Sequence, residues 1–297
     1  MSLDHLRGRH VGLIAKTHVR YSVRGGAGLI FLIISMLSGL IMANVVISPV
    51  EQISKMDKEA GGAGDTKKVV DQVVHKVGIP AIKRFTSGDA EQANYLVLEK
   101  PALVSAFMVI LIFFLPFLVS LGAFNQTAGD IGNRGLRYQL LRTERVNIFV
   151  GRFIGTTLFT FIVLAALLML VLLYLVIKAK FYPAGDVVAW MLRGYLAMVI
   201  YALPWIALCA WISTAIDSAF GSMVVAQIII LFWPILTWFA SQANHHASFL
   251  KYLMPWGYKW WMIHPSMSMF FAGTGVMLGF TALFGFLGLR HFQKRDL

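Results

Sequence analysis

Residues 101–129 read PALVSAFMVILIFFLPFLVSLGAFNQTAG and contain no Asp, Glu, Lys or Arg. A helix needs about 20 apolar residues to cross the roughly 30 Å hydrocarbon core of a bilayer, and this stretch is longer. In lipid, every backbone N–H and C=O must be satisfied within the protein, which favours a helix here. The stretch therefore predicts a membrane-spanning helix.

The same pattern recurs along the chain. Apolar residues make up 58% and charged residues only 13%, whereas a soluble protein carries about 25% charged residues. The runs are continuous, unlike the alternating strands of a membrane barrel, and six of them are too many for the buried helices of a soluble protein. The sequence therefore predicts an all-α membrane protein with six transmembrane helices. The five other charge-free runs are residues 25–50, 153–177, 194–216, 218–250 and 260–289.

The basic residues predict the orientation. An even number of spans places both termini on one side, and short loops rich in Lys and Arg remain in the cytoplasm. The segments at the two ends and between the second and third spans are basic and nearly free of acids. The Glu51–Lys100 loop carries as many acidic as basic residues. We therefore expect the N- and C-termini in the cytoplasm and the Glu51–Lys100 loop outside it.

The N-terminal segment predicts a helix of its own. Leu6, Leu13, Ile14 and Thr17 recur near helical spacing, while the basic residues lie elsewhere on the helix. This pattern is typical of an amphipathic helix lying in the membrane interface, with a disordered basic arm as the alternative. Basic residues close to membrane ends favour lipid head groups as a partner over nucleic acid.

Several local patterns predict packing. Gly61–Gly64 interrupts the outer loop, and a valine stripe after it predicts a helix over residues 65–77 that forms a contact surface or lid. Small residues at four-residue spacing predict close helix contacts; they are Gly151 with Gly155 and Gly275 with Gly279. Pro116 and Pro204 predict kinks within two spans, and the aromatic run Pro255–Trp261 predicts an interfacial or partly re-entrant segment.

Catalytic motifs are sparse. The chain has no Gly-Lys dipeptide and hence no G-x-x-x-x-G-K-[ST] phosphate loop, so we expect no catalytic residue and no cofactor in this chain. Its one cysteine, Cys209, excludes a disulfide within the chain. The candidate metal ligands are His245, His246 and His264 near the outer face, for which ordinary interfacial histidines are the alternative.

The most informative segment is residues 125–152, NQTAGDIGNRGLRYQLLRTERVNIFVGR, between the second and third spans. Leu136, Leu140 and Leu141 are expected to share one face of a short helix. Arginines surround it: Arg134, Arg137, Arg142 and Arg145. Such a face outside the membrane is suited to docking on another protein. A topology-setting basic loop would explain the arginines but not the leucines.

This segment resembles the corresponding loop of the permease subunits of ABC-2 type ATP-binding-cassette exporters. Asp130 matches the family's acid, Gly135-Leu136 a Gly-Thr-Leu-like step, Leu140-Leu141 its paired leucines, Arg145 its arginine and Gly151-Arg152 the start of the third span. Thr143-Glu144 replaces the usual Pro-Val, and Asn133-Arg134 replaces a more acidic stretch. The six spans and the large first outer loop also fit this family.

The resemblance implies a transport half without its motor. Residues 1–27 would be a cytoplasmic amphipathic segment, and residues 28–297 a six-helix domain in the bacterial inner (cell) membrane. A second copy or a homologous permease would face it, and a cytoplasmic ABC ATPase carrying ATP and Mg²⁺ would dock on the loops after spans two and four. The docking residues would be Asp130, Arg134, Leu136, Arg137, Leu140, Leu141, Arg142, Glu144 and Arg145, with Asp217 in the second loop.

Two other functions are consistent with the residues. One is a membrane enzyme with an extracytoplasmic histidine metal site, and the other is a scaffold that transports nothing. Export as the direction comes only from the resemblance. The apolar spans slightly favour an amphipathic or hydrophobic cargo.

Overall fold

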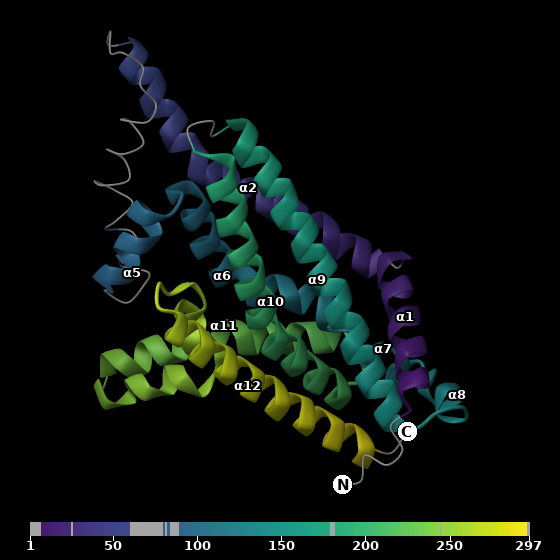
Figure 1. Ribbon diagram of the computed structural model, residues 1–297. Coiled ribbons are helices and arrows are strands. Elements are labelled where there is room, and N and C mark those ends of the chain that lie inside the picture. The colour runs from purple at the N-terminus through teal and green to yellow at the C-terminus, as the bar shows by residue number, and fades with distance from the viewer. Residues whose placement is uncertain are drawn as a thin grey trace.

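The computed structural model describes residues 7–24, 26–59, 80, 82–83, 89–178, 182–243 and 245–295. The described part of the chain contains helices and no strand. Its elements in order are α1 (Gly8–Arg24), α2 (Gly26–Glu59), α5 (Ala90–Asn94), the π-helix η2 (Tyr95–Glu99), α6 (Ala102–Ala123), α7 (Ala128–Gly132), α8 (Leu136–Leu140), α9 (Arg145–Lys178), α10 (Ala184–Ala215), α11 (Ala219–Ala243), the 3₁₀ helices η3 (His245–Leu253) and η4 (Pro255–Ile263), and α12 (Met267–Lys294) (Figure 1).

The prediction of six helices long and apolar enough to cross a membrane is confirmed: they are α2, α6, α9, α10, α11 and α12. Their ends differ from the charge-free runs. α9 begins at Arg145 and α10 at Ala184, so both helices extend beyond the apolar run through charged turns. α12 begins only at Met267, because the aromatic residues before it belong to η4.

The core lies around α6 and α10. In the most apolar stretch of each of these two helices 72% of the residues are buried, against 17% in α11 and in α12. α6 and α10 are therefore central in the bundle, and α11 and α12 are peripheral. Phe107 and Leu111 of α6 and Tyr201 and Ile206 of α10 are fully buried. Both helices continue through Pro116 and Pro204.

α1 packs against the first turns of α9, which confirms the close contact predicted at Gly151 and Gly155. A Cβ atom on Gly151 would lie 2.8 Å from the Ile14 Cβ, and one on Gly155 would lie 2.9 Å from the Ala15 carbonyl oxygen. Leu13, which belongs to the predicted amphipathic face, is 57% exposed and therefore not part of the face that meets α9. The face that meets α9 is centred on Val11 and Ala15, which are smaller and allow the helices to approach.

The second small-residue pair makes no such contact. A Cβ atom on Gly275 or on Gly279 would meet nothing within 4 Å in the described part of the chain. These glycines lie on the outer side of α12, whereas Gly273 and Met277 are buried.

The aromatic segment before α12 reaches into the bundle. The ring of Trp256 in η4 lies 5.1 Å from Phe113, 6.2 Å from Phe117 and 6.1 Å from Trp205, centroid to centroid. Phe113 and Phe117 are about 16 and 22 Å along α6 from its start, at 1.5 Å per residue. The segment therefore penetrates between helices, in agreement with the re-entrant reading of residues 255–261.

The last part of the Glu51–Lys100 loop lies at the opposite end of the bundle from α7 and α8 (Figure 1). Asp89 caps α5, and the Gln92 amide donates to the Trp260 carbonyl at 2.8 Å, so this part is fastened to η4. The helix predicted over residues 65–77 lies outside the described residues.

Candidate functional site: a platform of two joined loops

The segment after α6 and the turn after α10 are joined by buried hydrogen bonds. The Ser213 hydroxyl accepts from the backbone N–H groups of Thr127, at 2.7 Å, and Ala128, at 2.9 Å. The Thr127 hydroxyl donates to the Ser213 carbonyl at 2.9 Å. The two loops that the resemblance assigns to motor docking thus form one structure. We call it the loop platform and define it as residues 124–145 and 213–222.

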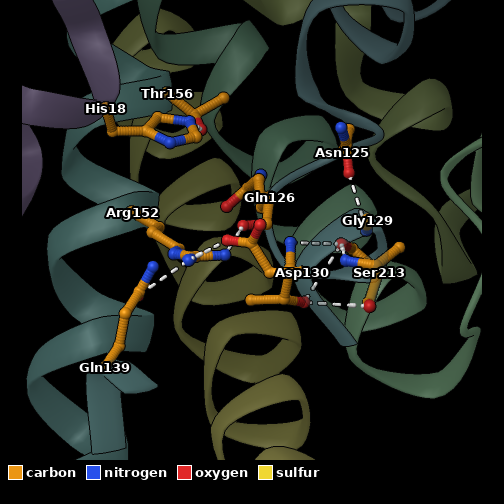
Figure 2. A network of polar contacts seen from close by, with 11 residues as sticks. His18, Asn125, Gln126, Gly129, Asp130, Gln139, Arg152, Thr156 and Ser213 are labelled. Atoms are coloured by element: carbon orange, nitrogen blue, oxygen red, sulfur yellow. Dashed lines mark hydrogen bonds and ion pairs between the residues drawn. The ribbon is translucent and has the colours of Figure 1, made fainter. Parts of the chain in front are cut away.

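Arg152 fastens the loop platform to α9 (Figure 2). Its side chain is only 7% exposed. The guanidinium donates to the Gln126 carbonyl at 2.7 Å and to the Gln139 side chain at 2.8 Å, and it forms an ion pair with the Asp130 carboxylate. The buried guanidinium of Arg152 therefore connects three parts of the loop platform: the residues that follow α6, helix α7 and helix α8. A buried guanidinium is stable only with such partners, because removing it from water is costly.

Arg145 is engaged by backbone carbonyl groups within the chain. Its guanidinium donates to the carbonyls of Phe292, at 3.1 Å, and Gln293, at 2.9 Å, and also to that of Arg295. The last carbonyls of a helix lack partners within the helix and carry partial negative charge, so a cation there is favourable. Arg145 thus caps the end of α12.

Asp217, the charge expected in the second docking loop, is also engaged within the chain. The Arg295 guanidinium forms an ion pair with the Asp217 carboxylate and donates to the Thr214 carbonyl. Arg145 and Arg295 therefore connect both loops through the end of α12.

The prediction that three leucines share a docking face was wrong. Leu136 is 1% exposed and packs in a small apolar cluster with Val146, Ile148 and Phe292. Leu140 is half-buried against that cluster, whereas Leu141 is 83% exposed. The reason is that Leu141 lies five positions after Leu136, which is about 140° around a helix of 3.6 residues per turn, so it points away from the face that Leu136 and Leu140 share.

The exposed part of the loop platform combines apolar and cationic side chains. Tyr138, three residues before Leu141, is 77% exposed, and Phe220, at the start of α11, is 69% exposed. The exposed charged residues of the platform are Arg134, Arg137, Arg142, Glu144 and Asp217. Sequence reasoning missed Tyr138 and Phe220. Tyr138 could have been noticed as an aromatic residue in a polar segment, whereas Phe220 lies inside a charge-free run.

Two histidines of α1 contact threonine hydroxyls of the loop platform and of α9. The His18 Nε2 lies 3.0 Å from the Thr156 hydroxyl, and the His10 Nδ1 lies 3.1 Å from the Thr143 hydroxyl (Figure 2 shows the first pair). Burial lowers the pKa of His18 to about 4, and the positive charge of Arg152 acts in the same direction, with Asp130 opposing them. His18 is therefore neutral at neutral pH.

Of the three candidate metal-ligating histidines, His264 is the one whose side chain the structure describes. No group of three His, Cys, Asp or Glu side chains that could hold a metal ion occurs in the described part of the chain. His264 Nε2 lies 3.7 Å from the Asp89 carboxylate, and its Nδ1 accepts from the Ser266 N–H at 3.1 Å. The side chains of His245 and His246 lie outside the described residues.

Comparison of the chain with models of protein families and with curated proteins finds no match.

Proposed function

We propose that the chain is the membrane permease subunit of an ATP-binding-cassette exporter of the ABC-2 type. A second copy or a homologous permease completes the translocation pathway, and a separate cytoplasmic ATPase, which binds ATP and Mg²⁺, drives it. In this proposal the loop platform and both termini face the cytoplasm. α1 lies at the surface of the bacterial inner membrane.

The joining of the two loops is the observation that supports the proposal most. If the two loops were separate, a docked motor would have to move each of them independently. Here the hydrogen bonds between Thr127 and Ser213 join the two loops, so that they can move together as one rigid unit. This body exposes Tyr138 and Leu141 among arginines. Aromatic residues and arginines are enriched where proteins bind one another.

The anchors of the loop platform provide a way to transmit motion. Arg152 connects it to α9, Ser213 to α10, and Arg145 to the end of α12. Displacement of the platform would therefore move long helices as a body instead of bending a flexible loop. Rigid-body movement of this kind is a common form of switching transition.

The test measures Mg²⁺-dependent ATPase activity that co-purifies with the tagged chain from mild detergent. Leu141→Asp places a charge at the exposed apolar contact, and losing an interface anchor costs about 2 kcal/mol or more. We expect this variant to fold and to lose most of the co-purifying ATPase. Leu98→Asp is the matched control, because Leu98 is 50% exposed at the opposite end, in η2.

Equal ATPase recovery with Leu141→Asp and Leu98→Asp would contradict the docking assignment. Recovery of the wild-type chain without an ATPase would favour the scaffold, and a bound metal with hydrolytic activity would favour the enzyme. Leu136→Asp should abolish folding instead, since Leu136 is buried, which separates loss of docking from loss of structure.

A further inference from the structure

A cavity of about 630 Å³ lies between α1, the loop platform and the first turns of α9. α1 contributes the apolar side chains of Leu13 and Ile14, together with His10, Thr17, His18 and Tyr21. Arg142 of the loop platform and Arg152 of α9 contribute guanidinium groups. A site that combines apolar and cationic side chains suits an amphiphile with an anionic head.

The positive charge in this cavity exceeds the negative charge. Arg152 is neutralised by Asp130, the one acidic residue that lines the cavity. The exposed side chain of Arg142 has no hydrogen-bond or ion-pair partner among the residues that the structure describes. One ring nitrogen of His10 faces Thr143, which leaves the other available to a ligand.

We propose that this cavity binds the phosphate head group of a membrane amphiphile. Arg142 contacts the phosphate, with His10 beside it, and Leu13 and Ile14 contact the start of the acyl chain. Arginine is suited to this role because its planar fork donates two parallel hydrogen bonds to phosphate oxygens. Leu13, which is 57% exposed, would then be covered by lipid. The inference rests on the placement of α1 at the membrane surface in the proposed function, and it does not require an ATPase.

A lipid is favoured over free phosphate as the source of the head group, because Leu13 and Ile14 line the cavity and free phosphate would leave them uncovered. The test uses native mass spectrometry of the purified chain in detergent, with phosphatidic acid as the probe and diacylglycerol of the same chain length as its phosphate-free counterpart. Glycerol 3-phosphate serves as the soluble arm. The wild-type chain should retain phosphatidic acid and not diacylglycerol.

Arg142→Ala should lower the retention of phosphatidic acid about tenfold, since hydrogen bonds to charged groups are among the strongest in proteins. Arg9→Ala is the matched control, because Arg9 is an exposed arginine on α1 that does not line the cavity. Leu13→Gln, which removes the apolar contact without adding charge, should lower lipid retention but leave glycerol 3-phosphate unaffected at equal ionic strength.

Equal losses with Arg142→Ala and Arg9→Ala would overturn the site, because they would reflect general attraction to a basic surface. Glycerol 3-phosphate binding as tight as that of phosphatidic acid would overturn the lipid as the source. The experiment contains no ATPase, so its failure is distinguishable from a failure of motor docking.

Discussion

Arg152 of α9 and Asp130 of α7 form an ion pair in which the arginine side chain is 7% exposed and the aspartate side chain 44% exposed. The pair joins a long helix to the loop platform, and neither partner is fully solvated. Each residue is therefore expected to depend on the other for its contribution to stability.

We expect Arg152→Met and Asp130→Ala each to lower the melting temperature of the purified chain in detergent. The double variant should be less destabilised than the sum of the single variants, since residues in one buried network couple by about 0.5–3 kcal/mol. Arg137→Met, at an exposed arginine of α8, should change the melting temperature little. Additive effects of the two single variants would show that the ion pair does not stabilise the loop platform.

The contact between α1 and α9 gives a second prediction. In Gly155→Ala the new methyl would meet the Ala15 backbone and the His18 Cβ at 2.9 Å, so α1 must shift. Overpacking of this kind costs about 1–3 kcal/mol. Limited trypsin digestion within α1 should become faster.

Gly279→Ala provides the control, because a Cβ atom there meets nothing within 4 Å in the described residues. Alanine is the better helix former by about 1 kcal/mol, so this variant should be neutral or slightly more stable. If Gly155→Ala digests no faster than Gly279→Ala, the packing of α1 on α9 is wrong.

The neutral His18 predicts a pH dependence. Its pKa is about 4 in the folded protein, against 6.5 for the unperturbed side chain. The unfolded state therefore binds a proton more readily, and stability falls as the pH falls from 6.5 towards 4. Above pH 6.5 His18 is neutral in both the folded and the unfolded state, so its titration costs no stability there.

The measurement is the melting temperature across this pH range for the wild-type chain and for His18→Gln, which keeps a polar group near Thr156 but cannot titrate. The variant should lose less stability than the wild type on acidification. Parallel curves for the two proteins would exclude His18 as the titrating group.

Orientation can be tested with the single thiol. In a Cys209→Ser background, a cysteine at Leu98 should react with an impermeant maleimide added to intact cells, and a cysteine at Tyr138 should not. Leu98 and Tyr138 are 50% and 77% exposed at opposite ends of the bundle, so both are accessible to the reagent from their own side. Labelling at Tyr138 alone would reverse the proposed topology.

The long helices could be predicted from sequence because lipid imposes one strong requirement, a run of apolar residues without charge. The close approach at Gly151 and Gly155 was also readable, since only glycine leaves room for another backbone. The loop platform was harder. Arg145 looks like any surface arginine, and its acceptors lie about 150 residues away at the end of α12.

The leucines could have been separated from the sequence. Leu136 and Leu141 were assigned to one face, although a spacing of five residues places them about 140° apart on a helix, and one is buried while the other is exposed. Thr127 and Ser213 are ordinary residues in the sequence. Their role follows only from the arrangement that brings them together.

Site-specific photo-crosslinking in cells tests whether the loop platform is the contact surface for an ATPase. A photoreactive residue at Tyr138 or Phe220 should capture one partner that contains a phosphate loop and hydrolyses MgATP, while the same residue at Leu98 should not. Capture of this ATPase from Leu98, or its absence from both Tyr138 and Phe220 while the exporter is assembled, would contradict docking of the ATPase on the loop platform.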